Sequence, residues 1–143
     1  MASGLLLVTL PGLCAGQSAR ELQVQALGTF ADRDFLGAGL GGALRSAGRA
    51  RVALTLHAGD LEGAFAGRGE LVASYHLNPF RQRGVTPYVG GGLTVGVADD
   101  DVFEYVVLLV GVETTPGRRT GWYAEVGLAG GVRIAAGFRV RWR

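Results

Sequence analysis

Arginine and glutamate residues recur at alternate positions in several segments of this chain. Near the C-terminus Arg133, Arg139 and Arg141 share one parity, and Glu125 has the matching parity in the segment before. Alternate residues of a β-strand point to the same face of a sheet, so these side chains are expected to meet. Paired charges would form a structural network, whereas unpaired arginines would form an anion-selective constriction. We favour the network, because unpaired charge is costly in a low-dielectric interior.

The same parity argument extends the predicted network to other segments. Its members are Arg45, Arg51, Glu70, Glu125, Arg133, Arg139 and Arg141. Glu21 has the same parity in the first segment, and Glu104 in the sixth is a further candidate. Opposite signs on adjacent segments predict ion pairs that neutralise the interior.

Two histidines and a serine could support metal binding or hydrolysis. If Thr55 pairs with Val72, His57 lies opposite Glu70 and His76 lies opposite Arg51. This register separates the two histidines by most of a strand, so a shared metal ion is not expected. We expect no cofactor of any other kind. Ser74 lies two residues from His76 on the same face, which keeps a hydrolase as an alternative. The sequence favours a protein that is not an enzyme.

Eight extended segments would position these side chains. They are residues 21–30, 35–45, 50–58, 69–77, 85–98, 102–113, 121–129 and 132–143, separated by turns, with residues 59–68 as the longest loop. Most alternate apolar with polar or small residues, which is typical of strands with two different faces. Residues 106–110 are apolar at both parities, so the sixth segment has no assigned facing.

The composition favours a closed barrel over a bundle or a soluble sheet. Glycine supplies 25 of the 143 residues and lies mainly inside the apolar segments, where it disfavours helices. Segments of this length suit tilted strands that cross a membrane. The predicted fold is therefore all-β, an eight-stranded antiparallel up-and-down transmembrane β-barrel with short turns. An even strand number places both termini on one side.

Aromatic residues collect near the two ends of the predicted strands. One group comprises Tyr75, Phe80, Tyr88, Trp122, Tyr123 and Trp142, and the other Phe30, Phe35, Phe65, Phe103 and Tyr105. Outer-membrane barrels carry such belts at the two membrane interfaces. We therefore predict Phe30, Tyr75, Tyr105, Trp122 and Trp142 as membrane-interface aromatics.

The first residues are typical of a secretory signal peptide. A short apolar stretch precedes small residues at 14–16, which predicts a signal peptide at residues 1–16, cleaved after residue 16 or alternatively after residue 19. The barrel domain would then comprise residues 17–143, exported through the inner membrane. The stretch before the apolar region lacks the usual basic residue.

Two motifs carry a family resemblance. The stretch Thr86-Pro87-Tyr88-Val89-Gly90-Gly91-Gly92 and the ending with Phe138, Val140 and Trp142 resemble those of small eight-stranded outer-membrane barrels of Gram-negative bacteria, the OmpA/OmpX-like β-barrel class. The resemblance implies that Phe138, Val140 and Trp142 form a C-terminal signal for the barrel-insertion machinery. Arg143 follows Trp142, whereas the family usually ends on the aromatic residue.

These features predict a non-enzymatic protein of the outer membrane, which we expect to be a monomer in outer-membrane lipid. Its expected role is structural, envelope-maintaining or surface-interacting, with a lumen plugged by ion pairs. The alternatives are a narrow anion-preferring channel or small-ligand transporter, and a secreted, soluble lipocalin-like barrel, which needs the opposite facing. A net charge of +2 is too small, and the arginines are too evenly spread, to suggest a nucleic-acid surface.

The turns differ in charge between the two predicted ends. Asp32, Asp34, Asp60, Glu62 and Asp99 to Asp101 share one end, and Arg49, Arg81, Arg83, Arg118 and Arg119 share the other. The basic turns would face the periplasm. There they could bind phosphate groups of the inner leaflet or could simply keep the turns soluble.

Overall fold

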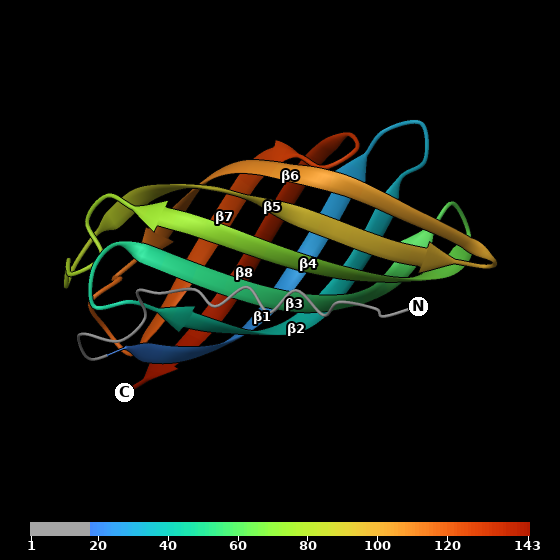
Figure 1. The fold of residues 1–143 in the computed structure, drawn as a ribbon. Helices are drawn as coiled ribbons and strands as arrows, with labels where there is room; N and C mark the ends of the chain where they lie inside the picture. The colour runs from blue at the N-terminus through green and yellow to red at the C-terminus, as the bar shows by residue number, and fades with distance from the viewer. Residues whose placement is uncertain (1–17) are drawn as a thin grey trace, which may run out of the picture.

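Eight antiparallel strands close on themselves to form a barrel (Figure 1). The structure is a computed structural model in which residues 18–143 are described. The predicted signal peptide, residues 1–16, lies outside the described residues. No helix long and apolar enough to cross a membrane occurs in the described part of the chain.

The strands follow the predicted segments closely. They are β1 (Ala19–Phe30), β2 (Phe35–Arg45), β3 (Ala50–Leu61), β4 (Ala64–His76), β5 (Val85–Ala98), β6 (Asp101–Thr114), β7 (Thr120–Leu128) and β8 (Val132–Trp142). Each strand pairs with the next, and β8 pairs with β1. All eight predicted strands are present, and the all-β barrel is confirmed.

The predicted loop at residues 59–68 is wrong. The β3–β4 turn contains only Glu62 and Gly63, which adopt positive φ angles of 51° and 88°. The Asp60 carboxylate accepts a hydrogen bond from the Gly63 amide at 2.7 Å and stabilises this tight turn. Because this stretch is polar and glycine-rich, it was predicted as a loop, although its residues on both sides of the turn belong to β3 and β4. Arg68 consequently lies inside β4.

The shorter turn also changes the register of the β3–β4 hairpin. Thr55 pairs with Glu70 instead of Val72, and His57 pairs with Arg68. His76 therefore does not lie opposite Arg51, whose partner is Ser74. The predicted register is wrong by two residues, which preserves the facing of every side chain because strands alternate with a period of two.

Apolar side chains face outward and polar side chains face the lumen. Leu36, Leu40 and Leu56 are 68%, 63% and 65% exposed, whereas Gln23 and Thr55 are buried. In β6, Val107 and Leu109 are buried and the intervening apolar residues are exposed, which assigns the facing of that strand. A soluble lipocalin-like barrel requires the reverse arrangement.

Inward glycines make room for large lumenal side chains. A Cβ atom at Gly96 would lie 2.0 Å from the Phe103 ring, and one at Gly111 would lie 2.4 Å from the Tyr88 ring. Each ring occupies the space that a side chain at the glycine position would need. This packing explains why so many glycines interrupt the strands.

The two ends of the barrel differ. The acidic end carries the turns at 31–34, 62–63, 99–100 and 129–131. The basic end carries the turns at 46–49, 77–84 and 115–119, together with the start of β1 and the end of β8. At the acidic end β6 extends past β7, which pairs only with residues 108–113 of β6. The β5–β6 hairpin therefore projects beyond the β7–β8 turn (Figure 1).

Candidate functional site

The lumen near the basic end contains a cluster of arginines around two glutamates. Glu21 on β1 accepts hydrogen bonds from Arg45 Nε at 3.0 Å, Arg51 Nε at 2.6 Å and Arg141 Nε at 2.9 Å. The Glu21 side chain is fully buried. One carboxylate therefore holds arginines from β2, β3 and β8 together.

Glu113 on β6 is the second acceptor of this basic-end cluster. Its carboxylate contacts Arg45 at 2.9 Å, Arg139 at 3.0 Å and His76 Nδ1 at 2.6 Å. Arg45 bonds to both Glu21 and Glu113, although β2 and β6 are not neighbours in the sheet. The cluster thus spans the lumen.

This basic-end cluster has more positive than negative groups. Its arginines are Arg45, Arg51, Arg139 and Arg141, and its carboxylates are Glu21 and Glu113. Arg139 is 1% exposed, and its Nε atom has no hydrogen-bond acceptor among the described residues. The excess gives this half of the lumen a positive potential.

A second cluster lies nearer the acidic end, and its charges balance. Glu70 contacts Arg68 at 2.9 Å and Arg133 at 2.8 Å. Arg133 also contacts Glu125 at 2.8 Å, and Glu125 accepts a hydrogen bond from the Tyr88 hydroxyl at 2.8 Å. Two arginines therefore face two glutamates in this acidic-end cluster.

Uncharged polar side chains fill the lumen beside the two clusters. Gln23 donates to Thr55 at 2.6 Å and accepts from Arg51, while the Tyr123 hydroxyl donates to Gln25 at 2.8 Å. All five residues are buried. The interior is a packed hydrogen-bonded layer, as expected for eight strands.

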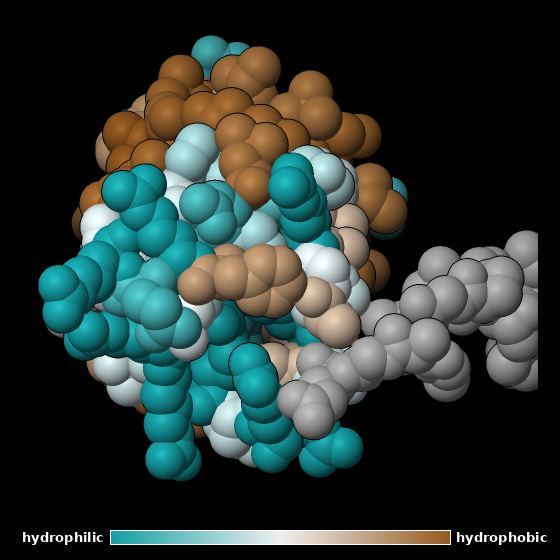
Figure 2. Space-filling model, turned by 90° about the vertical axis from the view of Figure 1, so that its left-hand side faces the viewer, coloured by the Kyte–Doolittle hydropathy of each residue, from teal (hydrophilic) through white to brown (hydrophobic). Residues whose placement is uncertain are grey.

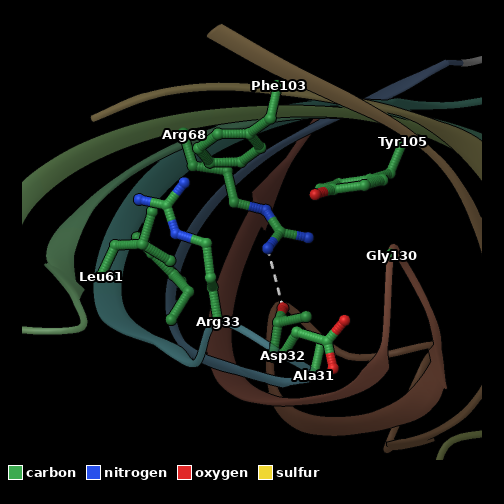
Figure 3. Close-up of a pocket in the computed structure, with 10 residues that line it drawn as sticks. Ala31, Asp32, Arg33, Leu61, Arg68, Phe103, Tyr105 and Gly130 are labelled. Carbon is green, nitrogen blue, oxygen red and sulfur yellow. Dashed lines mark hydrogen bonds between the residues drawn. The ribbon is translucent and has the colours of Figure 1, made fainter. Parts of the chain in front are cut away.

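A pocket of about 260 Å³ opens at the acidic end (Figure 3). Phe103 and Tyr105 lie on one side, and the turn residues Asp32 and Arg33 lie on the other. Arg68 at its inner side donates to Thr29 at 2.7 Å, the bond drawn dashed in Figure 3. Below it, Leu27, Phe35, Leu61, Ala66, Ala98 and Ala135 form an apolar cluster.

The structure brings together the charges predicted from parity and adds others. All seven predicted network residues lie in the interior or at its rim: Arg45, Arg51, Glu70, Glu125, Arg133, Arg139 and Arg141. Glu104 is exposed on the outside, so its suggested inward position is wrong. Two buried charges were not predicted: Arg68, which was expected in a loop, and Glu113, which lies in the segment without alternation. At the end of this segment Gly111 and Glu113 alternate with Val110 and Val112, and this short alternation is the signal that could have found Glu113.

Most predicted interface aromatics face outward. Phe30, Tyr75, Trp122 and Trp142 are 49%, 49%, 65% and 41% exposed. Tyr105 has the inward parity and lines the acidic-end pocket. It lies on the part of β6 that extends past β7. It therefore does not occupy the expected lipid-facing position.

Four other aromatics assigned to the belts point inward. Phe35, Tyr88 and Tyr123 are buried, and Phe103 lines the pocket. In the C-terminal motif, Phe138 and Val140 are half-buried, and Phe138 packs against Trp122 with ring centroids 5.0 Å apart.

Ser74, His76 and Glu113 form a hydrogen-bonded chain. The Ser74 hydroxyl lies 3.0 Å from His76 Nε2, and His76 Nδ1 lies 2.6 Å from Glu113. Such an order of groups can activate a serine nucleophile. However, all three residues are buried, and two arginines share the Glu113 carboxylate. No group of residues that could hold a metal ion is found in the described part of the chain.

Comparison with known proteins identifies similar folds. No family model and no curated protein sequence matches the chain. The N-terminal β-barrel domain of Pseudomonas aeruginosa OprF matches with a TM-score of 0.61 and 17% identity, over 88% of this chain and 100% of that domain. Neisserial surface protein A, NspA, matches with a TM-score of 0.61 and 14% identity, over 87% and 97%. The chain therefore has the fold of the small eight-stranded outer-membrane β-barrels, as its motifs predicted.

Proposed function

We propose that this chain is a non-enzymatic integral protein of the bacterial outer membrane with a structural, envelope-maintaining or surface-interaction role. The observation that carries this proposal is the facing of the barrel wall. Exposed leucines and valines cover the outside, while the charged side chains of the strands are mostly buried in the lumen. Lipid would solvate the outside, and closure leaves no strand edge unpaired along most of the wall.

The second part of the proposal is that ion pairs plug the lumen. The buried arginines and glutamates lie within 2.6–3.2 Å of their acceptors or donors in both clusters. Breaking such a network leaves uncompensated buried charge, which is strongly unfavourable. A monomeric barrel in outer-membrane lipid, inserted by the barrel-insertion machinery, fits this arrangement.

Heat-modifiability tests the membrane proposal. Residues 17–143 would be folded into detergent micelles and run on an SDS gel with and without boiling. A folded, detergent-resistant barrel would migrate differently before and after boiling. Folding in buffer without detergent, with no gel shift, would contradict the proposal.

We further propose that the acidic end faces the outside of the cell and the basic end the periplasm. Because the number of strands is even, β1 begins and β8 ends at the same end of the barrel, the basic end. Cys14, the only cysteine, lies in the predicted signal peptide, so single cysteines can be introduced in the turns. A membrane-impermeant maleimide added to whole cells should label Asp100→Cys and not Gln82→Cys. Labelling of Gln82→Cys alone would reverse the orientation.

An anion-preferring channel is a second candidate function, favoured by the excess of arginine in the basic-end cluster. A channel would conduct in planar bilayers with a preference for anions, and Arg139→Ala would change that preference. Bilayers that stay silent with folded protein would remove this candidate.

A hydrolase is a third candidate, favoured only by the chain from Ser74 to Glu113. Esterase activity of the folded protein that disappears in Ser74→Ala, with the heat shift retained, would support it. Activity equal in Ser74→Ala and the original protein would exclude Ser74 as the nucleophile.

A further inference from the structure

A patch of four arginines surrounds Trp142 on the rim of the basic end. Arg118, Arg119, Arg141 and Arg143 line an open groove of about 430 Å³ together with Trp142. Arg118 and Arg119 are exposed in the β6–β7 turn. The view onto this end shows a largely hydrophilic face bordered by apolar side chains (Figure 2). We call these four residues the arginine patch.

The backbone beneath the arginine patch is held in place. The Arg141 amide donates to the Arg119 carbonyl at 2.6 Å, and the Arg141 guanidinium donates to the Pro116 carbonyl. The Gly117 amide donates to the Arg81 carbonyl at 2.8 Å, which ties the turn to residues 77–84. Little ordering of the backbone is therefore needed when an anion binds.

The turns around the arginine patch contain no acidic residue. Residues 46–49, 77–84 and 115–119 contain arginine but no aspartate or glutamate. The Arg141 guanidinium pairs with Glu21 at 2.8 Å, and this carboxylate is shared with Arg45 and Arg51. The charges of the exposed Arg118 and Arg119, which have no acidic residue in their own turn or in the neighbouring turns, are therefore suited to an external anion.

An apolar groove continues from the arginine patch along the outer wall. This groove, about 460 Å³, is lined by Leu22, Leu44, Leu54 and Leu71, with Trp142 and Arg20 among its other lining residues. Trp142 thus borders both the charged groove and the apolar groove. A ligand that spans both needs a negative head and a hydrocarbon chain.

We propose that the arginine patch binds the phosphate of an anionic phospholipid in the inner leaflet, with an acyl chain along the apolar groove. This inference rests on the proposed membrane location. Arginine presents several N–H donors that suit phosphate oxygens. Trp142 lies where headgroup and chain meet, the position that interfacial tryptophans favour. Because the apolar groove suits a hydrocarbon chain, we assign a lipid and not free phosphate to this site.

Trp142 can report on its own lipid neighbours. The chain has two tryptophans, so Trp122→Phe leaves Trp142 as the only indole. This protein would be folded into vesicles of phosphatidylcholine in which either the phosphatidylcholine or added phosphatidylglycerol carries brominated acyl chains, which quench tryptophan fluorescence. We expect stronger quenching by brominated phosphatidylglycerol at equal mole fraction, which gives a relative binding constant for the anionic lipid.

Arg118→Gln with Arg119→Gln removes two charges from the arginine patch. The preference for phosphatidylglycerol should fall by about fivefold or more, since each arginine near an anionic lipid contributes measurably to binding. The matched control is Arg81→Gln with Arg83→Gln, which removes equal charge from another exposed turn at the same end. This control should retain most of the preference.

The outcomes separate the site from its alternatives. An equal loss in both double variants would overturn the inference in favour of diffuse surface charge, and no preference in the parent would overturn it outright. Abolition of the preference by millimolar inorganic phosphate would assign the patch to free phosphate instead. If neither brominated lipid quenches Trp142, the protein is not in the bilayer, and the proposed membrane location fails instead.

Discussion

The two ends of the barrel are filled in different ways. At the basic end, three buried arginines and the half-buried Arg141 surround two glutamates. At the acidic end, two arginines balance two glutamates, and the apolar cluster around Leu27 and Phe35 fills the lumen beyond them. Ion pairs therefore stabilise the lumen at the basic end, whereas apolar packing stabilises it at the acidic end.

The outer charges follow the same division. Of the 14 arginines, only Arg33, Arg68 and Arg133 belong to the acidic end or its cluster. Of the 12 acidic residues, only Glu21 and Glu113 belong to the basic end or its cluster. The small net charge thus conceals a strong separation of charge along the barrel.

The largest expected effect is at the shared carboxylate of the basic end. Glu21→Gln should lower the free energy of unfolding by about 3–5 kcal/mol, because it leaves several buried arginines without their counter-charge. Urea titration in lipid vesicles, followed by tryptophan fluorescence, measures this change.

Glu125→Gln is the matched test at the other cluster. Its partner Arg133 also contacts Glu70 at 2.8 Å, so the expected loss is smaller, about 1–3 kcal/mol. Equal losses in the two variants would show that the excess of arginine at the basic end carries no energetic consequence.

The second prediction concerns the apolar packing of the acidic end. Leu27 is 1% exposed inside the lumen, and Leu27→Ala should cost about 2–5 kcal/mol because it opens a cavity. Leu36→Ala, on the outer wall, should cost less, since lipid tails can fill the space that the side chain leaves. The same urea titration compares them, and a larger loss in Leu36→Ala would contradict the assigned facing.

Parity in the sequence predicted the facing of most lumenal charges, with Arg68, Glu104 and Glu113 as exceptions, but it did not predict which charges meet. Arg45 and Glu113 belong to β2 and β6, which are brought together only by closure of the barrel. Arg68 was hidden by a turn of two residues in a glycine-rich stretch. A local pattern specifies the facing of a side chain, whereas contacts across a lumen depend on register and curvature accumulated over several strands.

The smallest expected effect separates surface from buried charge at the acidic end itself. Arg33 lies 3.7 Å from both Glu62 and Asp101, and all three side chains are about half exposed or more. Exposed pairs of this kind contribute little, so Arg33→Gln should change the free energy of unfolding by less than about 0.5 kcal/mol. Its buried counterpart is Arg68, whose side chain is 1% exposed and contacts Glu70 at 2.9 Å.

Arg68→Gln should cost several times more than Arg33→Gln, because Glu70 would lose one of two buried partners and Thr29 and Thr94 would lose a donor. Raising the salt concentration should reduce the small Arg33 effect and leave the Arg68 effect nearly unchanged, since buried pairs are screened much less. A salt-sensitive Arg68 effect would mean that water and ions reach the lumen, which would favour the channel over the plug.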